Sequence, residues 1–91
     1  MGGLGIVVPA FRPDVGRLTS YLHELCAALD PDAIRVEIDD PHAETLTTLS
    51  ELEDSGLTVH AVPYRRGKGA AVTAGFEALS TDRLAFVDAD G

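Results

Sequence analysis

A chain of 91 residues is long enough for one small domain, and its 45% hydrophobic content is that of a globular protein rather than a disordered one. A formal net charge of −8 argues against direct binding of nucleic acid, and no apolar run is long enough to cross a membrane. The surplus of acid, with Lys68 as the only Lys, favours a protein of a high-salt cytoplasm. The one cysteine, Cys26, cannot form an internal disulfide, which also fits a cytosolic protein.

Short apolar runs alternate with segments of helical periodicity along the chain. The first run predicts a strand at 4–8, which we expect Pro9 to end. Asp14 can cap a helix at 15–29, whose apolar residues recur every three or four positions: Val15, Leu18, Leu22, Leu25 and Leu29. The same reasoning predicts strands at 34–38, 57–62 and 83–87 and helices at 41–55 and 70–79.

This order of elements, βαβαβαβ, predicts an α/β fold. Alternating elements of this length indicate a Rossmann-like, three-layer architecture with a mostly parallel four-stranded sheet and right-handed crossovers. In the last helix Ala71, Gly75 and Ala78 form a strip of small residues that would allow close approach to the sheet. The whole chain, residues 1–91, is expected to form one domain.

Unusual polar stretches follow each predicted strand. They are Pro9-Ala10-Phe11-Arg12, Asp39-Asp40, Arg65-Arg66-Gly67-Lys68-Gly69 and Asp88-Ala89-Asp90. Because open α/β sheets bind ligands beyond the carboxyl ends of their strands, we expect these stretches to meet at one edge of the sheet.

Each stretch has a structural and a functional interpretation. Asp88 and Asp90 could form a polar turn, or they could present two carboxylates on one side to Mg²⁺ or Mn²⁺. Asp39 and Asp40 could cap the following helix, or accept hydrogen bonds from a base or ribose. The segment 65–69 could be a solvated basic turn, or a diphosphate site at a helix N-terminus.

Two protein classes each fit part of this pattern of strand-end residues. A receiver-like α/β signalling module would use Asp39 and Asp40 as its acidic pocket and Lys68 as its switch cation. A dinucleotide-binding domain would use Gly67 and Gly69 before the last helix.

Taken together, the four stretches resemble family 2 glycosyltransferases of the GT-A fold. The matching segments are Ile6-Val7-Val8-Pro9-Ala10-Phe11, Ile38-Asp39-Asp40, Arg66-Gly67-Lys68-Gly69-Ala70-Ala71 and Phe86-Val87-Asp88-Ala89-Asp90-Gly91. The last two together look most similar to the dolichyl-phosphate glucosyl- and mannosyltransferase branch.

The resemblance implies a role for each matching residue, which we state as expectations. Pro9, Ala10 and Phe11 would border the nucleoside, Asp40 with Asp39 would bind the base, and Lys68 would lie near the phosphates; Asp88 would contact ribose or metal, and Asp90 the metal. The divalent metal, Mg²⁺ or Mn²⁺, would neutralise charge on the leaving nucleoside diphosphate.

The resemblance also implies that the acceptor site and the general base lie beyond residue 91. We therefore expect residues 1–91 to be the donor-binding, N-terminal half of an inverting GT-A domain, ending at its DxD motif and inactive alone. The donor would be of the UDP-glucose or GDP-mannose type, and the acceptor a dolichyl or other polyprenyl phosphate at the cytoplasmic face of a membrane. An uncovered sheet edge would favour self-association.

Overall fold

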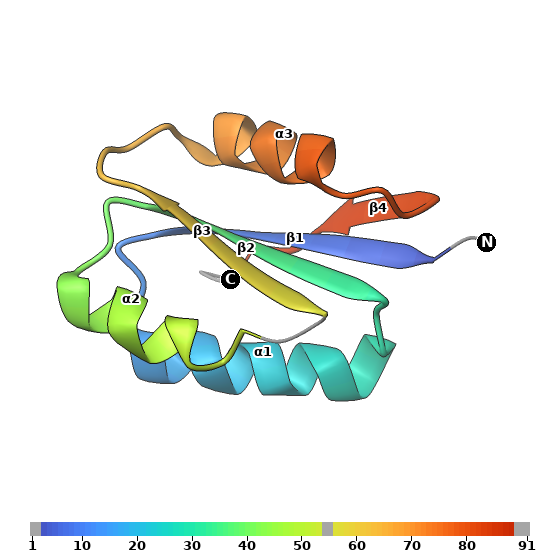
Figure 1. The fold of residues 1–91 in the computed structure, drawn as a ribbon, viewed down its shortest axis with the longest axis horizontal. Helices are drawn as coiled ribbons and strands as arrows, with labels where there is room; N and C mark the ends of the chain where they lie inside the picture. Colours follow the sequence, from blue (N-terminus) through green and yellow to red (C-terminus); the bar gives the residue numbers. More distant parts are fainter. Residues whose placement is uncertain (1–2, 54–55, 89–91) are drawn as a thin grey trace.

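A computed structural model of the chain describes residues 3–53 and 56–88. In this part, strands β1 Leu4–Phe11, β2 Ala33–Asp39, β3 Leu57–Val62 and β4 Arg83–Phe86 form one parallel sheet in the order β3-β2-β1-β4. The connecting helices are α1 Val15–Leu29, α2 Ala43–Ser50 and α3 Lys68–Ala78. Helices α1 and α2 cover one face of the sheet and α3 covers the other, which makes three layers (Figure 1). The predicted fold class is confirmed.

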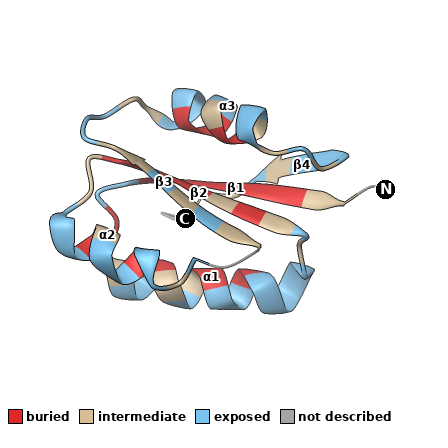
Figure 2. Ribbon diagram, viewed as in Figure 1, coloured by how far each residue is buried: buried red, intermediate tan, exposed pale blue. Residues whose placement is uncertain are grey.

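The main hydrophobic core lies between the sheet and the α1–α2 layer. It consists of Ile6 and Val8 from β1, Ile34, Val36 and Ile38 from β2, Leu18, Leu22 and Leu25 from α1, and Leu49 from α2. Both helices are buried along the sheet-facing side and exposed on the other, whereas the middle of β1 is buried throughout (Figure 2). The apolar stripe predicted for α1 therefore packs on the sheet, as its period requires.

The ends of the two helices in this layer differ from expectation. Leu29 belongs to the predicted stripe but is 49% exposed, because α1 ends there and Asp30 turns the chain in a left-handed conformation. Helix α2 stops at Ser50, well before the predicted end, because the next amides bond to carbonyls three residues back, as Leu52 does to Leu49. None of the described helices has the length and apolar character needed to span a membrane.

Helix α3 packs closely on the opposite face of the sheet. Ala71, Val72 and Gly75 are its buried residues. A Cβ added to Gly75 would lie 2.6 Å from both Cγ atoms of Val7 on β1, so only glycine allows this approach. The prediction of a small-residue strip is therefore right for Ala71 and Gly75, whereas Ala78 is exposed.

Strand β1 continues through Pro9, contrary to the prediction that proline ends it. The Val87 amide donates to the Val7 carbonyl, so the backbone groups of odd-numbered β1 residues point toward β4. Pairing with β4 ends at Val7–Phe86, and Pro9 lies just past that point. Its missing N–H faces β4 and therefore removes no bond to β2, so β1 goes on pairing with β2 as far as Phe11.

Because the strands are parallel, their carboxyl ends meet at one edge of the sheet. The register places Phe11 beside Asp39, and Asp39 beside Val62. The loop after β3 returns to this edge and begins α3 at Lys68. This edge is where the predicted site residues of the described part of the chain lie.

Candidate functional site

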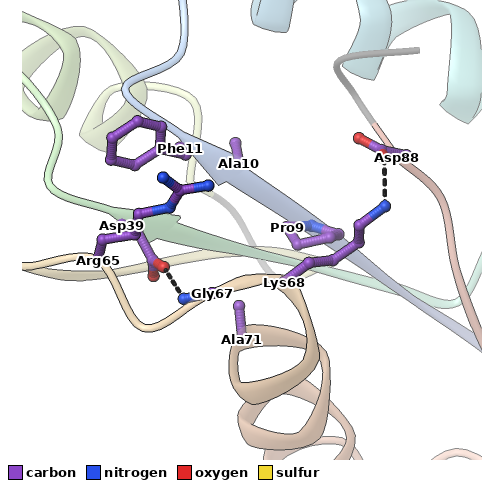
Figure 3. A pocket seen from close by; sticks show the side chains of 9 residues that line it. All are labelled: Pro9, Ala10, Phe11, Asp39, Arg65, Gly67, Lys68, Ala71 and Asp88. Carbon is purple, nitrogen blue, oxygen red and sulfur yellow. Dashed lines mark hydrogen bonds and ion pairs between the residues drawn. The ribbon is translucent and has the colours of Figure 1, made fainter.

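A pocket of about 150 Å³ opens at the carboxyl edge of the sheet. Its lining comes from the end of β1, the end of β2, the loop before α3, the first turns of α3 and the segment after β4: Pro9, Ala10, Phe11, Asp39, Arg65, Gly67, Lys68, Ala71 and Asp88 (Figure 3). All residues predicted to bind nucleotide line this pocket except Asp40, which directly follows Asp39, the last residue of β2. Segments far apart in sequence thus converge, as expected for polar stretches that follow parallel strands.

Asp39 holds the loop before α3 in place. Its side chain is almost fully buried and accepts hydrogen bonds from the Arg66 Nε at 2.6 Å, the Arg66 amide at 2.7 Å and the Gly67 amide at 2.9 Å. Burial raises the pKa of Asp39, but these bonds outweigh it and keep the pKa below its usual value. Both carboxylate oxygens are therefore occupied by the protein itself.

Asp40 does not line the pocket, and its side chain pairs with Arg12, which follows β1. Its Oδ2 lies 3.1 Å from the Arg12 Nε, and both side chains are well exposed. Both residues have a positive φ, 43° for Arg12 and 49° for Asp40, which turns the chain sharply after each strand. Of the predicted acid pair, Asp40 is thus the one with a solvent-accessible carboxylate.

Phe11 and Arg65 form one wall of the pocket. The Arg65 guanidinium carbon lies 4.6 Å from the centre of the Phe11 ring, within the range of a cation–π contact. Phe11 is 39% exposed, and Figure 3 shows the guanidinium of Arg65 beside its ring. A flat aromatic surface with a cation beside it suits the stacking of a planar, electron-rich ring.

Lys68 and Asp88 face each other across the opposite side of the pocket. The Lys68 Nζ lies 2.6 Å from the Asp88 Oδ2 (Figure 3). Lys68 is also the first residue of α3, after Gly67 at φ 96°. A helix N-terminus carries partial positive charge, so the ammonium group and the helix end together favour an anion here.

A metal site at Asp88 and Asp90 is an expectation from the sequence. No group of three His, Cys, Asp or Glu side chains within 3–53 and 56–88 is arranged to hold a metal ion. Mg²⁺, however, commonly takes one or two carboxylates and completes its shell with water and substrate phosphates. Asp88 at the pocket fits such a shared site. Asp90, the second predicted ligand, lies outside the described residues.

Sequence reasoning missed a buried ionic cluster next to this pocket. Glu37 on β2 is fully buried and interacts with the Arg35 Nε, with the His60 Nδ1 at 2.8 Å and with the Arg66 Nη1 at 2.9 Å. Burial raises the pKa of Glu37, but the bonds from His60, Arg35 and Arg66 outweigh it and hold the pKa below its usual value. Polar and apolar residues alternate in β2, which indicates that Arg35, Glu37 and Asp39 share one face of the strand. The alternation does not show whether other residues cover that face.

Arg66 connects this cluster to the loop. Burial lowers the pKa of Arg66, but the bonds to Asp39 and Glu37 outweigh this effect and raise the pKa above its usual value, so the guanidinium stays charged. Its Nη2 is buried without a hydrogen-bond partner among the described residues. A signal was present in the sequence, because central strands of parallel sheets are buried on both faces, so an acid there needs a partner.

Comparison with known proteins identifies the family. A search of curated proteins gave no match. The model of the family described as "Glycosyl transferase family 2" matches residues 6–91, which is nearly the whole chain. This match and the parallel α/β sheet agree with the resemblance seen in the strand-end motifs. The chain therefore belongs to glycosyl transferase family 2.

Proposed function

We propose that the carboxyl-edge pocket binds the nucleoside diphosphate part of a sugar donor, with a divalent metal shared between protein and diphosphate. Membership of the family supports a glycosyltransferase that uses a nucleotide sugar and an acceptor. The observation that carries the finer proposal is the pocket itself, where Phe11, Lys68, the N-terminus of α3 and Asp88 come together.

The charges around the pocket suggest how such a donor would lie. The base would stack against Phe11, within reach of the accessible carboxylate of Asp40. Asp39 would contribute by holding the loop rather than by contacting the base, since its oxygens already accept bonds from Arg66 and Gly67. The diphosphate would lie near Lys68 and the first turn of α3.

Asp88, together with Asp90, is the proposed protein ligand set for Mg²⁺ or Mn²⁺. A metal bound there supplies electrostatic stabilisation of the charge that develops on the departing nucleoside diphosphate. Lys68 bonds Asp88 in the structure, so its ammonium would have to move from the carboxylate to the diphosphate when donor and metal bind. Such an exchange keeps the local charge balanced in both states.

The acceptor is proposed from the sequence motifs alone. Residues 66–71 and 86–91 resemble the dolichyl-phosphate glucosyl- and mannosyltransferase branch, which suggests a polyprenyl phosphate acceptor and an inverting reaction at a cytoplasmic membrane face. The receiver-like alternative is disfavoured, because the loop engages Asp39, and Asp40, the accessible acid, does not line the pocket that holds Lys68.

Calorimetric titration of the chain with UDP-glucose and GDP-mannose tests this proposal. One of the donors should bind with Mg²⁺ or Mn²⁺ present and at least about tenfold more weakly in EDTA. Asp88→Asn should reduce the gain from metal, whereas Asp82→Asn, the same change at an exposed position before the amino end of β4, should preserve it. Equal affinity with and without metal would refute the metal assignment, and no binding of either donor would refute the pocket assignment.

A further inference from the structure

Glu37 occupies an unusual position for a charged residue. It lies on β2 between β1 and β3, is 0% exposed, and does not line the pocket. It therefore cannot touch a donor bound there. A fully buried carboxylate in the centre of a sheet is costly unless it is paired, so the partners of Glu37 indicate what it does.

Those partners lead to the pocket through Arg66. The Arg66 Nη1 donates to Glu37 at 2.9 Å, while its Nε donates to Asp39 at 2.6 Å, so the guanidinium bridges two carboxylates on one face of β2. The Arg66 side chain is only 10% exposed. Its neighbours in sequence, Arg65 and Gly67, both line the pocket, and Lys68 follows directly. Fixing the Arg66 side chain thus fixes the turn that begins α3.

The cluster is close to charge-balanced. The carboxylates of Glu37 and Asp39 face the guanidinium groups of Arg35 and Arg66, and the His60 ring approaches from β3. A neutral amide at position 37 would turn its NH₂ either toward Arg35, which now bonds Oε2, or toward Arg66 and His60, which now contact Oε1, so at least one guanidinium would lose its acceptor. The Arg66 Nη2 already lacks a partner among the described residues, so if Nη1 is released the guanidinium keeps only the bond from its Nε to Asp39.

We propose that Glu37 is a positioning residue for the diphosphate end of the pocket: through Arg66 it holds the Gly67–Lys68 turn in the conformation that receives the phosphates. This inference rests on the proposed function for its ligand. Glu37 would thus affect donor binding without touching the donor, since it does not line the pocket. Loss of Glu37 should weaken binding of the diphosphate while leaving binding of the nucleoside unchanged.

NMR titration of Glu37→Gln tests this, with UDP and GDP each compared with its own nucleoside. The variant should bind the diphosphate about tenfold more weakly, the equivalent of one lost hydrogen bond to a charged group, and the nucleoside as the wild type does. Without ligand, the amides of Arg66 and Gly67, which donate to Asp39, should exchange faster with solvent. Arg66→Lys keeps the charge but cannot bridge both carboxylates, so it should show the same selective loss.

Two controls separate positioning from general destabilisation. Arg35→Gln removes a different donor to Glu37 and leaves the Arg66 contacts in place, so it should preserve the diphosphate affinity. The double variant Glu37→Gln with Arg66→Lys should bind diphosphate no more weakly than Arg66→Lys alone, since the two residues act in series.

Several results would overturn the inference. They are an equal loss for nucleoside and diphosphate, additive effects in the double variant, a loss of the same size in Arg35→Gln, or unchanged exchange at Arg66 and Gly67. Failure of the proposed function looks different. The wild type would then bind no diphosphate, while faster exchange at the two amides in Glu37→Gln would still show that Glu37 positions the turn.

Discussion

Replacing Asp39 with Asn should destabilise the protein by about 3 kcal/mol, whereas the same replacement at Asp40 should cost at most about 1 kcal/mol. The two residues are adjacent in sequence and chemically identical, so the difference depends entirely on their surroundings. The comparison therefore tests whether the acid pair has divided its roles, with Asp39 supporting the loop and Asp40 facing the solvent.

The expected magnitudes follow from burial. Asp39 is 3% exposed and accepts bonds at 2.6, 2.7 and 2.9 Å from Arg66 and Gly67. Breaking a buried ion pair by removing one partner costs about 3–5 kcal/mol, and Asn lies at the lower end because its amide oxygen still accepts a bond. The side chains of Asp40 and Arg12 are 38% and 54% exposed, so solvent screens their pair, and Asn tolerates the positive φ at position 40.

Urea unfolding of the two variants, followed by far-UV circular dichroism at neutral pH, measures the difference. Both should unfold with the m-value of the wild type, so that a change in midpoint reports stability directly. Asp39→Asn within about 1 kcal/mol of the wild type would contradict the account of the loop. A loss of similar size in Asp40→Asn would contradict the assignment of Asp40 as the exposed member of the pair.

Two further predictions concern the packing of α3 and the response to acid. Gly75→Ala should destabilise the protein by about 1–2 kcal/mol, because the new Cβ meets Val7 on a central strand and the better helix propensity of Ala offsets only part of the strain. Gly69→Ala has open space around its Cβ, so it should be neutral or slightly stabilising in the same unfolding assay. The pKa values of Glu37 and Asp39 are lower in the folded protein than in the unfolded chain, so both carboxylates stabilise the fold above about pH 4, the range of their unfolded pKa values. This stabilisation is lost as the pH falls through their pKa values in the folded protein. The stability of Glu37→Gln should therefore depend less steeply on pH below about 4, by up to about 1.4 kcal/mol per pH unit, and an unchanged slope would show that Glu37 does not take up a proton on unfolding.

Much of this fold was predictable because its local and global signals agree. The period of the apolar residues indicated each strand and helix, and Asp14 caps α1 through the Arg17 amide as its position suggested. The parallel order then required the polar stretches at the strand ends to meet at one edge, which is where the pocket lies. Pro9 was misinterpreted, because the effect of a missing N–H depends on which neighbouring strand it faces.

The buried ionic cluster could not be predicted in the same way. Alternation in β2 shows that Arg35, Glu37 and Asp39 share a face, but it does not show what covers that face. Covering requires the loop after β3 to fold back over β2, and the partner that pairs with Glu37 and Asp39, Arg66, comes from that loop. Its sequence context is that of a basic turn, so its burial depends on tertiary structure alone.

Whether the carboxyl edge of the sheet binds a nucleoside diphosphate can be measured by an NMR titration of the isotope-labelled chain with UDP and GDP in the presence of Mg²⁺. The amides of Ala10, Phe11, Gly67 and Lys68 should shift, because these residues line the pocket at that edge. No saturable shift is expected at the opposite edge, where a separate cavity of about 520 Å³ is lined by residues that include Leu22, Cys26 and Leu57. Shifts confined to that second cavity, or no shifts at either edge, would contradict binding of a nucleoside diphosphate at the carboxyl edge.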